Sequence, residues 1–404
     1  MTTLRRRFQT EIGSLPKDAD VWILAGQSNM EGCGYLAGAS RPDPRVRCFT
    51  MDGHRWEVAR DPLHPLALSL APVDLTLRTA VTPAEIADQG PEAVRRYWVK
   101  RSCGTGAGLG LAFGTAYAQA TGRPVGLIPA AHGGTSLEQW NPKRKGEGLG
   151  SLYGAMLERL RLSGGSARLR GILWYQGESD ATAAEAPTYA TRFAKWIAAV
   201  RRDTGKPRLP VIAVQIGCVA DANRETGPWG QIREAQLEMP LRVPHTAVAA
   251  SIDLGLHDAI HIDTAGLRRL GRRMARLALG LEKGKKTEAD GPRFEKLSVR
   301  TIENDRAETD LFFRNVSGGW KADAAGRITG FSILDRKGKP HAKNIVTAAF
   351  PHPKKQNGIV VRTAALPQPG DRIAYGASLY PICNAVDEAD MALPAFTATV
   401  GRGK

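Results

Sequence analysis

Three residues have the types and the spacing needed to break an ester bond: Ser28, Asp258 and His261. A serine hydroxyl attacks a carbonyl carbon when a base takes its proton, and a carboxylate commonly orients that base. His261 is the candidate base, and Asp258 lies three residues before it, within reach of its ring on a turn or a helix start. These residues therefore predict ester hydrolysis with Ser28 as the nucleophile.

Hydrogen-bond donors for a negatively charged oxygen occur at two other places in the chain. Gly133 and Gly134 lack side chains that would cover a backbone N–H, and Gln176 has a side-chain amide. Together with the backbone N–H of Ser28, we expect Gly134 and Gln176 to form an oxyanion hole with three donors. The residues expected to support this set are its neighbours in the sequence: Gln27, Asn29, Gly133 and Glu178.

Two of these assignments have competitors in the sequence. His257 competes with His261 for the role of the base. Asp253 and Glu178 compete with Asp258 for the role of the acid that orients it. The residue types alone leave both alternatives open.

The elements that must position these residues alternate between apolar runs and helical patterns. Five apolar runs have the length of buried strands: residues 21–25, 125–131, 171–175, 211–216 and 247–252. Helical patterns accompany them: residues 109–120, 150–162, 189–202 and 267–281. This alternation favours a parallel sheet with helices on both faces. Because parallel strands end at one edge of the sheet, the candidate residues that follow them would gather there.

The pattern changes at two places along the chain. Residues 46–101 interrupt it with prolines and polar residues, and we expect an insertion that shapes a substrate cleft. Residues 283–292 have the composition of a linker, and alternating runs of sandwich-like spacing follow them. These runs are residues 296–300, 310–313, 330–334, 358–362 and 372–375. We therefore predict an esterase domain over residues 1–282 and a small β-sandwich-like domain over residues 291–404.

Composition narrows the classes of function. The 404 residues are 42% hydrophobic and 24% charged, which is typical of a globular protein, and no apolar stretch has the length of a membrane span. The five cysteines are odd in number and lack CxxC spacing, and the eight histidines lack HExxH spacing, so no metal site is expected. The net charge of +16 is explained by a solvated, Arg-rich surface or, as a functional interpretation, by attraction of an anionic substrate. The dispersed basic residues argue against nucleic acid as a partner.

Several segments resemble the sialate O-acetylesterases of the SGNH hydrolase superfamily, which are related to the acetylxylan esterases of carbohydrate esterase family six. The most specific are residues 22–32 (WILAGQSNMEG) and 174–180 (WYQGESD). The others are 133–135 (GGT), 232–236 (IREAQ), 258–261 (DAIH), 375–378 (YGAS), 383–384 (CN) and 393–396 (LPAF). The resemblance thus extends over most of the chain.

The resemblance implies a flavodoxin-like three-layer α/β/α domain that removes acetyl groups from sugar hydroxyls without a metal or cofactor. It assigns Ser28 as nucleophile, His261 as base and Asp258 as its partner, with Gly134 and Gln176 completing the oxyanion hole. It also implies an acetylated carbohydrate as the substrate and a secreted or periplasmic location, although the N-terminal residues do not form a signal-peptide pattern. The alternatives are an acetylxylan esterase and a carbohydrate-binding protein without catalytic activity.

Overall fold

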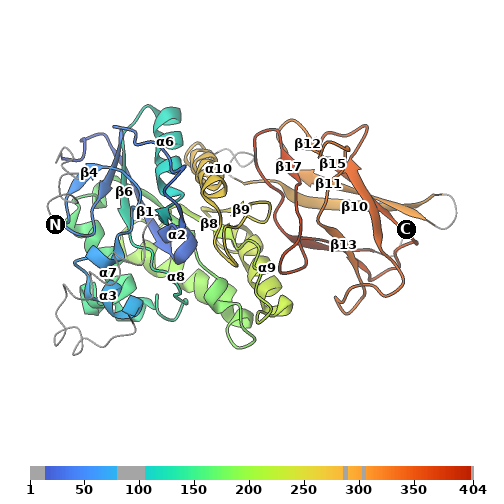
Figure 1. Ribbon diagram of the computed structural model, residues 1–404, viewed down its shortest axis with the longest axis horizontal. Helices are drawn as coiled ribbons and strands as arrows, with labels where there is room; N and C mark the ends of the chain where they lie inside the picture. The colour runs from blue at the N-terminus through green and yellow to red at the C-terminus, as the bar shows by residue number, and fades with distance from the viewer. Residues whose placement is uncertain (1–13, 80–104, 285–289, 303–305, 402–404) are drawn as a thin grey trace. The chain divides into compact units, whose positions relative to one another are not determined.

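A computed structural model describes residues 14–79, 105–284, 290–302 and 306–401, and Figure 1 traces them along the chain. The elements fall into two compact units. The first consists of Met1–Ser179, Thr191–Ile212 and His261–Ala275, and the second of Asp180–Ala190, Ala213–Ile260 and Arg276–Lys404. The chain thus passes several times from one unit to the other.

A seven-stranded sheet contains the N-terminal strands in the order β4-β3-β6-β1-β7-β8-β9. Its strands are β1 (Asp20–Gly26), β3 (Val46–Phe49), β4 (Trp56–Val58), β6 (Val125–Pro129), β7 (Leu169–Tyr175), β8 (Val211–Gln215) and β9 (Thr246–Ala250). β1 pairs in parallel with β6 and β7, and β3 pairs in parallel with β6, whereas β4 is antiparallel at the edge. All five strands predicted for this sheet are present.

Helices cover both faces of the sheet in the first unit. Trp22 of β1 makes ring contacts with Phe113 of α6 (Gly110–Thr121). Trp174 of β7 contacts Trp196 of α8 (Tyr189–Asp203). Trp174 is the lateral neighbour of Ala25, and Ala25 faces away from Trp22 because successive strand side chains alternate between the two faces. α6 and α8 therefore lie on opposite faces, as the predicted three-layer fold requires.

The remaining predicted helices are α7 (Leu152–Leu162) and α10 (Thr264–Glu282), and both are present. α9 (Thr226–Arg242) was not predicted, because it contains the helix breakers Gly227, Pro228, Gly230 and Pro240. The short helical segments are α2 (Ser28–Glu31), α3 (Pro72–Thr79), η1 (Leu66–Leu68), η2 (Pro142–Gly150), η3 (Ser166–Arg168), η4 (Glu178–Asp180) and η5 (Ala186–Thr188). None of the helices that the structure describes combines the length and the apolar character of a membrane span.

The stretch predicted as an insertion begins inside the sheet. β3 pairs with β6 and β4 pairs with β3, so residues 46–58 extend one edge of the sheet rather than leaving it. β3 has only four residues, which is too short for a strand pattern to stand out in the sequence. A separate two-stranded ribbon pairs β2 (Gly34–Tyr35) with β5 (Thr105–Ala107). Residues 80–101 of the predicted insertion lie outside the described residues.

Antiparallel sheets form the C-terminal region, as the alternating pattern predicts. One has the order β10-β11-β15-β14, a second the order β13-β16-β18, and β12 pairs with β17. The strands are β10 (Arg293–Thr301), β11 (Ala307–Arg314), β12 (Trp320–Lys321), β13 (Phe331–Leu334), β14 (Val346–Pro351), β15 (Gly358–Thr363), β16 (Arg372–Tyr375), β17 (Val386–Asp387) and β18 (Phe396–Thr399). The five predicted C-terminal strands are among them.

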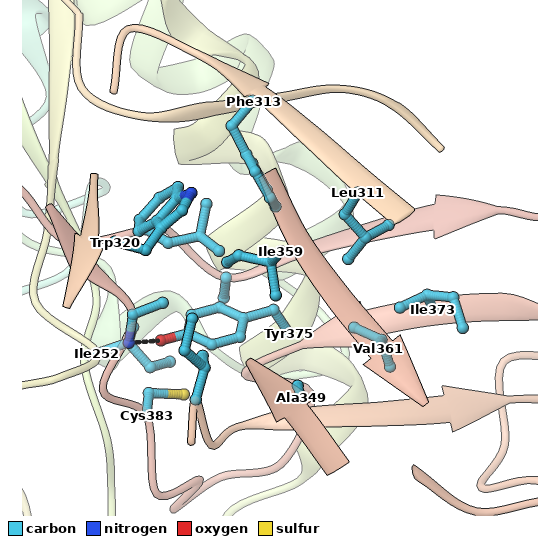
Figure 2. Close-up of a cluster of buried hydrophobic side chains, with 14 of the residues drawn as sticks. Ile252, Leu311, Phe313, Trp320, Ala349, Ile359, Val361, Ile373, Tyr375 and Cys383 are labelled. Carbon is cyan, nitrogen blue, oxygen red and sulfur yellow. Dashed lines mark hydrogen bonds between the residues drawn. The ribbon is translucent and has the colours of Figure 1, made fainter. Parts of the chain in front are cut away.

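The C-terminal sheets contribute to a hydrophobic core that also contains residues from the N-terminal part of the chain. Figure 2 shows Trp320, Ile359 and Tyr375 packed within this core. Cys218 and Ile252, which follow β8 and β9, are buried in the same cluster. The domain boundaries at residues 282 and 291 stay a prediction, and residues 285–289 between them lie outside the described residues.

Candidate active site

The turn after β1 presents Ser28. Gly26 has a φ of 134°, and a Cβ atom built on it would lie 2.1 Å from the carbonyl oxygen of Tyr175, so this position requires glycine. The N–H of Gln27, a buried residue, donates to the same Tyr175 oxygen at 2.8 Å. Ser28 follows as the first residue of α2 and is half-buried. Its hydroxyl makes no hydrogen bond to any residue in the described ranges.

The loop after β6 lies against Ser28. The N–H of His132 donates to the carbonyl oxygen of Gly26 at 3.0 Å and thereby joins the ends of β6 and β1. A Cβ atom built on Gly133 would lie 3.4 Å from the Cβ of Ser28. The structure therefore brings Gly133 and the predicted nucleophile together.

Glu31 holds the loop that contains Gly133 and Gly134, which we call the glycine loop. Its carboxylate oxygen Oε2 accepts a hydrogen bond of 2.8 Å from the N–H of Gly133, and the side chain is buried. Gly134 is exposed and has a φ of 71°, a left-handed conformation that favours glycine. The backbone N–H groups of Gly134 and Ser28 donate to no group within the described part of the chain. Both are available as donors to an oxyanion.

Further hydrogen bonds hold the glycine loop in place. Each ring nitrogen of His132 faces a carbonyl oxygen, with Nδ1 3.0 Å from Gly133 and Nε2 3.1 Å from Asp74. The hydroxyl of Thr135 donates to the carbonyl oxygen of His132 at 2.7 Å. The amide nitrogen of Gln176 donates to the carbonyl oxygen of Thr135 at 3.0 Å. Gln176 thus contacts the loop that contains Gly134, as expected for two members of one oxyanion hole.

Asn29 links the nucleophile segment to the segment of His261. Its side-chain oxygen accepts a hydrogen bond of 3.0 Å from the N–H of Ile262, the residue after His261. Its side-chain nitrogen donates to Glu178 Oε1 at 3.0 Å, and both side chains are buried. Neighbours in sequence of Ser28 and of His261 are therefore in direct contact, and His261 itself is half-buried.

Asp258 belongs to the second unit, and the boundary between the units falls after Ile260. Its Oδ1 accepts a hydrogen bond of 2.8 Å from the N–H of Ile260, and its Oδ2 lies 3.6 Å from Nε2 of His257. The side chain of Asp258 is 44% exposed. His257, Asp258 and His261 all have side chains of types that can bind a metal ion, and they include the candidate base and acid. The competition between His257 and His261 therefore stays open.

A buried ion pair behind the loop was not predicted. Asp74 of α3 pairs with Arg159 of α7, and both side chains are at least 99% buried. The hydroxyl of Ser69 donates to the same carboxylate at 2.6 Å. Because the carbonyl oxygen of Asp74 contacts His132, this ion pair anchors α3 against the glycine loop. Asp74 and Arg159 are 85 residues apart, so no local pattern could indicate the contact.

Two more titratable side chains are buried in the stretch before α3. Burial raises the pKa of Asp61 to about 7. Burial, together with the charge of Arg159, lowers the pKa of His64 to about 4. His64 is therefore neutral at pH 7, and Asp61 binds its proton up to near neutral pH.

Comparisons with known proteins point to one family. The family model described as carbohydrate esterase, sialic acid-specific acetylesterase matches residues 18–280. The chain is also similar to the probable carbohydrate esterase At4g34215 of Arabidopsis thaliana, with 29% identity over 289 residues, which are 67% of this chain and 94% of the relative.

A solved structure shares the fold. The crystal structure of XAC1771, described as a novel carbohydrate acetylesterase from Xanthomonas citri, matches with a TM-score of 0.65 and 24% identity. The match covers 94% of this chain and 80% of that chain, so the common fold includes the C-terminal sheets. The structure of the Arabidopsis thaliana protein AT4G34215 matches with a TM-score of 0.49 and 26% identity over 66% of this chain and 99% of that chain.

Proposed function

Because the chain belongs to the family of carbohydrate esterases described as sialic acid-specific acetylesterases, and is thus a carboxylic ester hydrolase, we propose that it removes O-acetyl groups from carbohydrates through an acetyl-enzyme on Ser28. The observation that supports this most strongly is the meeting of three strand ends. Ser28 follows β1, Gly134 follows β6 and Gln176 follows β7, and hydrogen bonds join the three segments.

The proposed reaction has two steps. In the first, His261 takes the hydroxyl proton of Ser28 as the oxygen attacks the acetyl carbon, and Asp258 orients the imidazole. The tetrahedral intermediate collapses, the sugar oxygen leaves with the proton from His261, and acetyl-Ser28 remains. In the second step, His261 takes a proton from water and the resulting hydroxide attacks the acetyl carbon. The bond to Ser28 breaks, His261 returns its proton to the Ser28 oxygen, and acetic acid leaves and ionises to acetate.

The developing negative charge in both steps is on the acetyl oxygen. The N–H groups of Ser28 and Gly134, which have no acceptor in the described part of the chain, are proposed as two of its donors. The primary amide of Gln176 is proposed as the third. Donors that are already oriented need no reorganisation when the charge develops. The hydrogen bonds to the glycine loop orient its N–H groups in this way.

An acidic sugar is the proposed substrate class. The net charge of +16 would raise the local concentration of an anionic ligand, and the sialic acids named in the family description are anionic. O-acetylated sialic acid is therefore proposed ahead of neutral acetylated xylan. A preference for the neutral substrate at low ionic strength would refute this choice.

The test compares the wild type with Ser28→Ala on 4-nitrophenyl acetate, O-acetylated sialic acid and acetylated xylo-oligosaccharides. We expect the variant to lose activity on all three while it keeps its fold. Ser40→Ala is the matched control, because Ser40 is also a half-buried serine and takes no part in the hydrogen bonds that join the three strand ends. Full activity of Ser28→Ala would contradict the proposal.

A further inference from the structure

The segment that begins at the last residue of β8 connects the C-terminal sheets with the loop that contains Asp258. We call residues 215–220 the bridging segment. The side-chain oxygen of Gln215 accepts a hydrogen bond of 2.7 Å from the N–H of Ala395, and its nitrogen donates to the carbonyl oxygen of Ala395 at 2.9 Å. These paired bonds tie the start of the bridging segment to the residue before β18.

Arg233 of α9 joins the bridging segment to the turn after β16. Its guanidinium donates to the carbonyl oxygens of Gly376 at 2.9 Å and Ser378 at 2.7 Å. It also donates to those of Gly217 at 2.6 Å and Ile216 at 3.2 Å. The side chain is only 3% exposed. A guanidinium presents five donors in a fixed plane, so a lysine at this position could not satisfy the same set of oxygens.

The far end of the bridging segment reaches the Asp258 loop. The N–H of Val219 donates to the carbonyl oxygen of Leu379 at 2.9 Å. The next N–H, that of Ala220, donates to the carbonyl oxygen of Ala259 at 2.7 Å. Ala259 follows Asp258 directly. A continuous series of hydrogen bonds therefore runs from the C-terminal sheets to the residue beside the candidate acid.

The apolar core supports the same connection. Cys218 of the bridging segment and Ile252, which precedes the Asp258 loop, are both buried in the core of the C-terminal sheets. Figure 2 shows Ile252 among the buried side chains around Tyr375. The loop that contains Asp258 thus begins near Ile252, which this core holds in place. The hydrogen bond from Ala220 holds it again at Ala259.

We propose that the C-terminal sheets position Asp258 for catalysis, with Arg233 as the positioning residue that couples them to the loop. The inference rests on the proposed role of Asp258 as the partner of the base. It makes the C-terminal region a necessary part of the esterase rather than a separate binding module. A purely structural role for Arg233 would change how much protein folds but not how fast each folded molecule reacts.

The test compares Arg233→Lys with the wild type in the full chain. A fluorophosphonate that labels the active serine counts the competent sites, and initial rates on 4-nitrophenyl acetate are divided by that count. We expect kcat per competent site to fall by about ten- to a hundredfold while KM changes little, since a misplacement of about 1 Å can cost a hundredfold. Arg362→Lys is the matched control, because Arg362 pairs with Glu308 within the C-terminal sheets and does not contact the bridging segment.

An unchanged kcat per competent site in Arg233→Lys would overturn the proposal. If that variant does not fold, native-state hydrogen exchange of the wild type decides. We expect the amides of Val219, Ala220 and Ile260 to become exposed in one opening event. Opening of Ala220 and Ile260 at a lower free energy than Val219 would refute the coupling. Failure of the proposed function is distinct, because it appears as full activity of Ser28→Ala.

Discussion

Glu31 offers a sharp test of how the oxyanion hole is held. Its carboxylate accepts the N–H of Gly133, and the carbonyl group of Gly133 shares a peptide plane with the N–H of Gly134. Replacing Glu31 with alanine removes the acceptor and leaves a backbone N–H without its partner. Replacing it with glutamine keeps an oxygen acceptor at the same reach, removes the charge and replaces the second carboxylate oxygen with an NH2 donor.

The expected loss follows from the contacts on the loop. Complete loss of one oxyanion donor costs about 100- to 1000-fold in rate. The loss of rate in Glu31→Ala should be smaller than this, because His132 still contacts the carbonyl oxygen of Gly133. We therefore expect kcat to fall about 10- to 100-fold in Glu31→Ala. Glu31→Gln should remain within about fivefold of the wild type, because a neutral hydrogen bond retains roughly half the strength of a charged one.

The assay is the rate of acetate release from an acetylated sugar, normalised to the sites that a fluorophosphonate labels. A boronate inhibitor that mimics the tetrahedral intermediate should lose affinity for Glu31→Ala in parallel with kcat, whereas KM should change little. Equal losses in Glu31→Ala and Glu31→Gln would refute the reasoning, because the acceptor oxygen would then be irrelevant.

Three further predictions concern stability. Gly26→Ala should destabilise the protein by more than about 2 kcal/mol in chemical denaturation, since its Cβ would overlap the carbonyl oxygen of Tyr175 and its φ is positive; an unchanged midpoint would contradict this. Arg159→Met should lower the free energy of unfolding by about 3–5 kcal/mol, because it leaves Asp74 buried without its cation. The double variant Arg159→Met with Asp74→Leu should recover much of this stability. The pKa of Asp61 is raised to about 7 from its ordinary value of 3.8, so the folded state binds the extra proton between these pH values. Unfolding free energy should therefore fall as pH rises from 4 to 7, and less steeply in Asp61→Asn.

The strand ends could be predicted because each is marked locally. Ser28 and Gln176 follow apolar runs of strand length, and Gly133 and Gly134 follow a third. A parallel sheet places such ends at one edge, and the observed pairing of β1 with β6 and β7 agrees with this. A local signal for Glu31 also exists in the sequence. Glu31 lies three residues after Ser28, and residues three apart on a helical turn share one face.

The long-range polar contacts could not be predicted. Arg233 lies 143 residues from Gly376, and the segment 232–236 stood out only by its resemblance to a family. α9 itself was missed because its prolines and glycines hide the helical pattern. Contacts of this kind depend on how distant turns meet, and neither hydrophobic periodicity nor residue spacing carries that information.

The most direct test of the central claim is to trap the acetyl-enzyme. The wild type is mixed with an excess of an acetylated sugar, quenched with acid during turnover, digested and analysed by mass spectrometry. We predict a single acetyl group on the peptide that contains Ser28, absent in Ser28→Ala and absent once the substrate is exhausted. Steady turnover without an acetylated peptide, or an acetyl group on another residue that forms and decays at the rate of catalysis, would contradict Ser28 as the nucleophile.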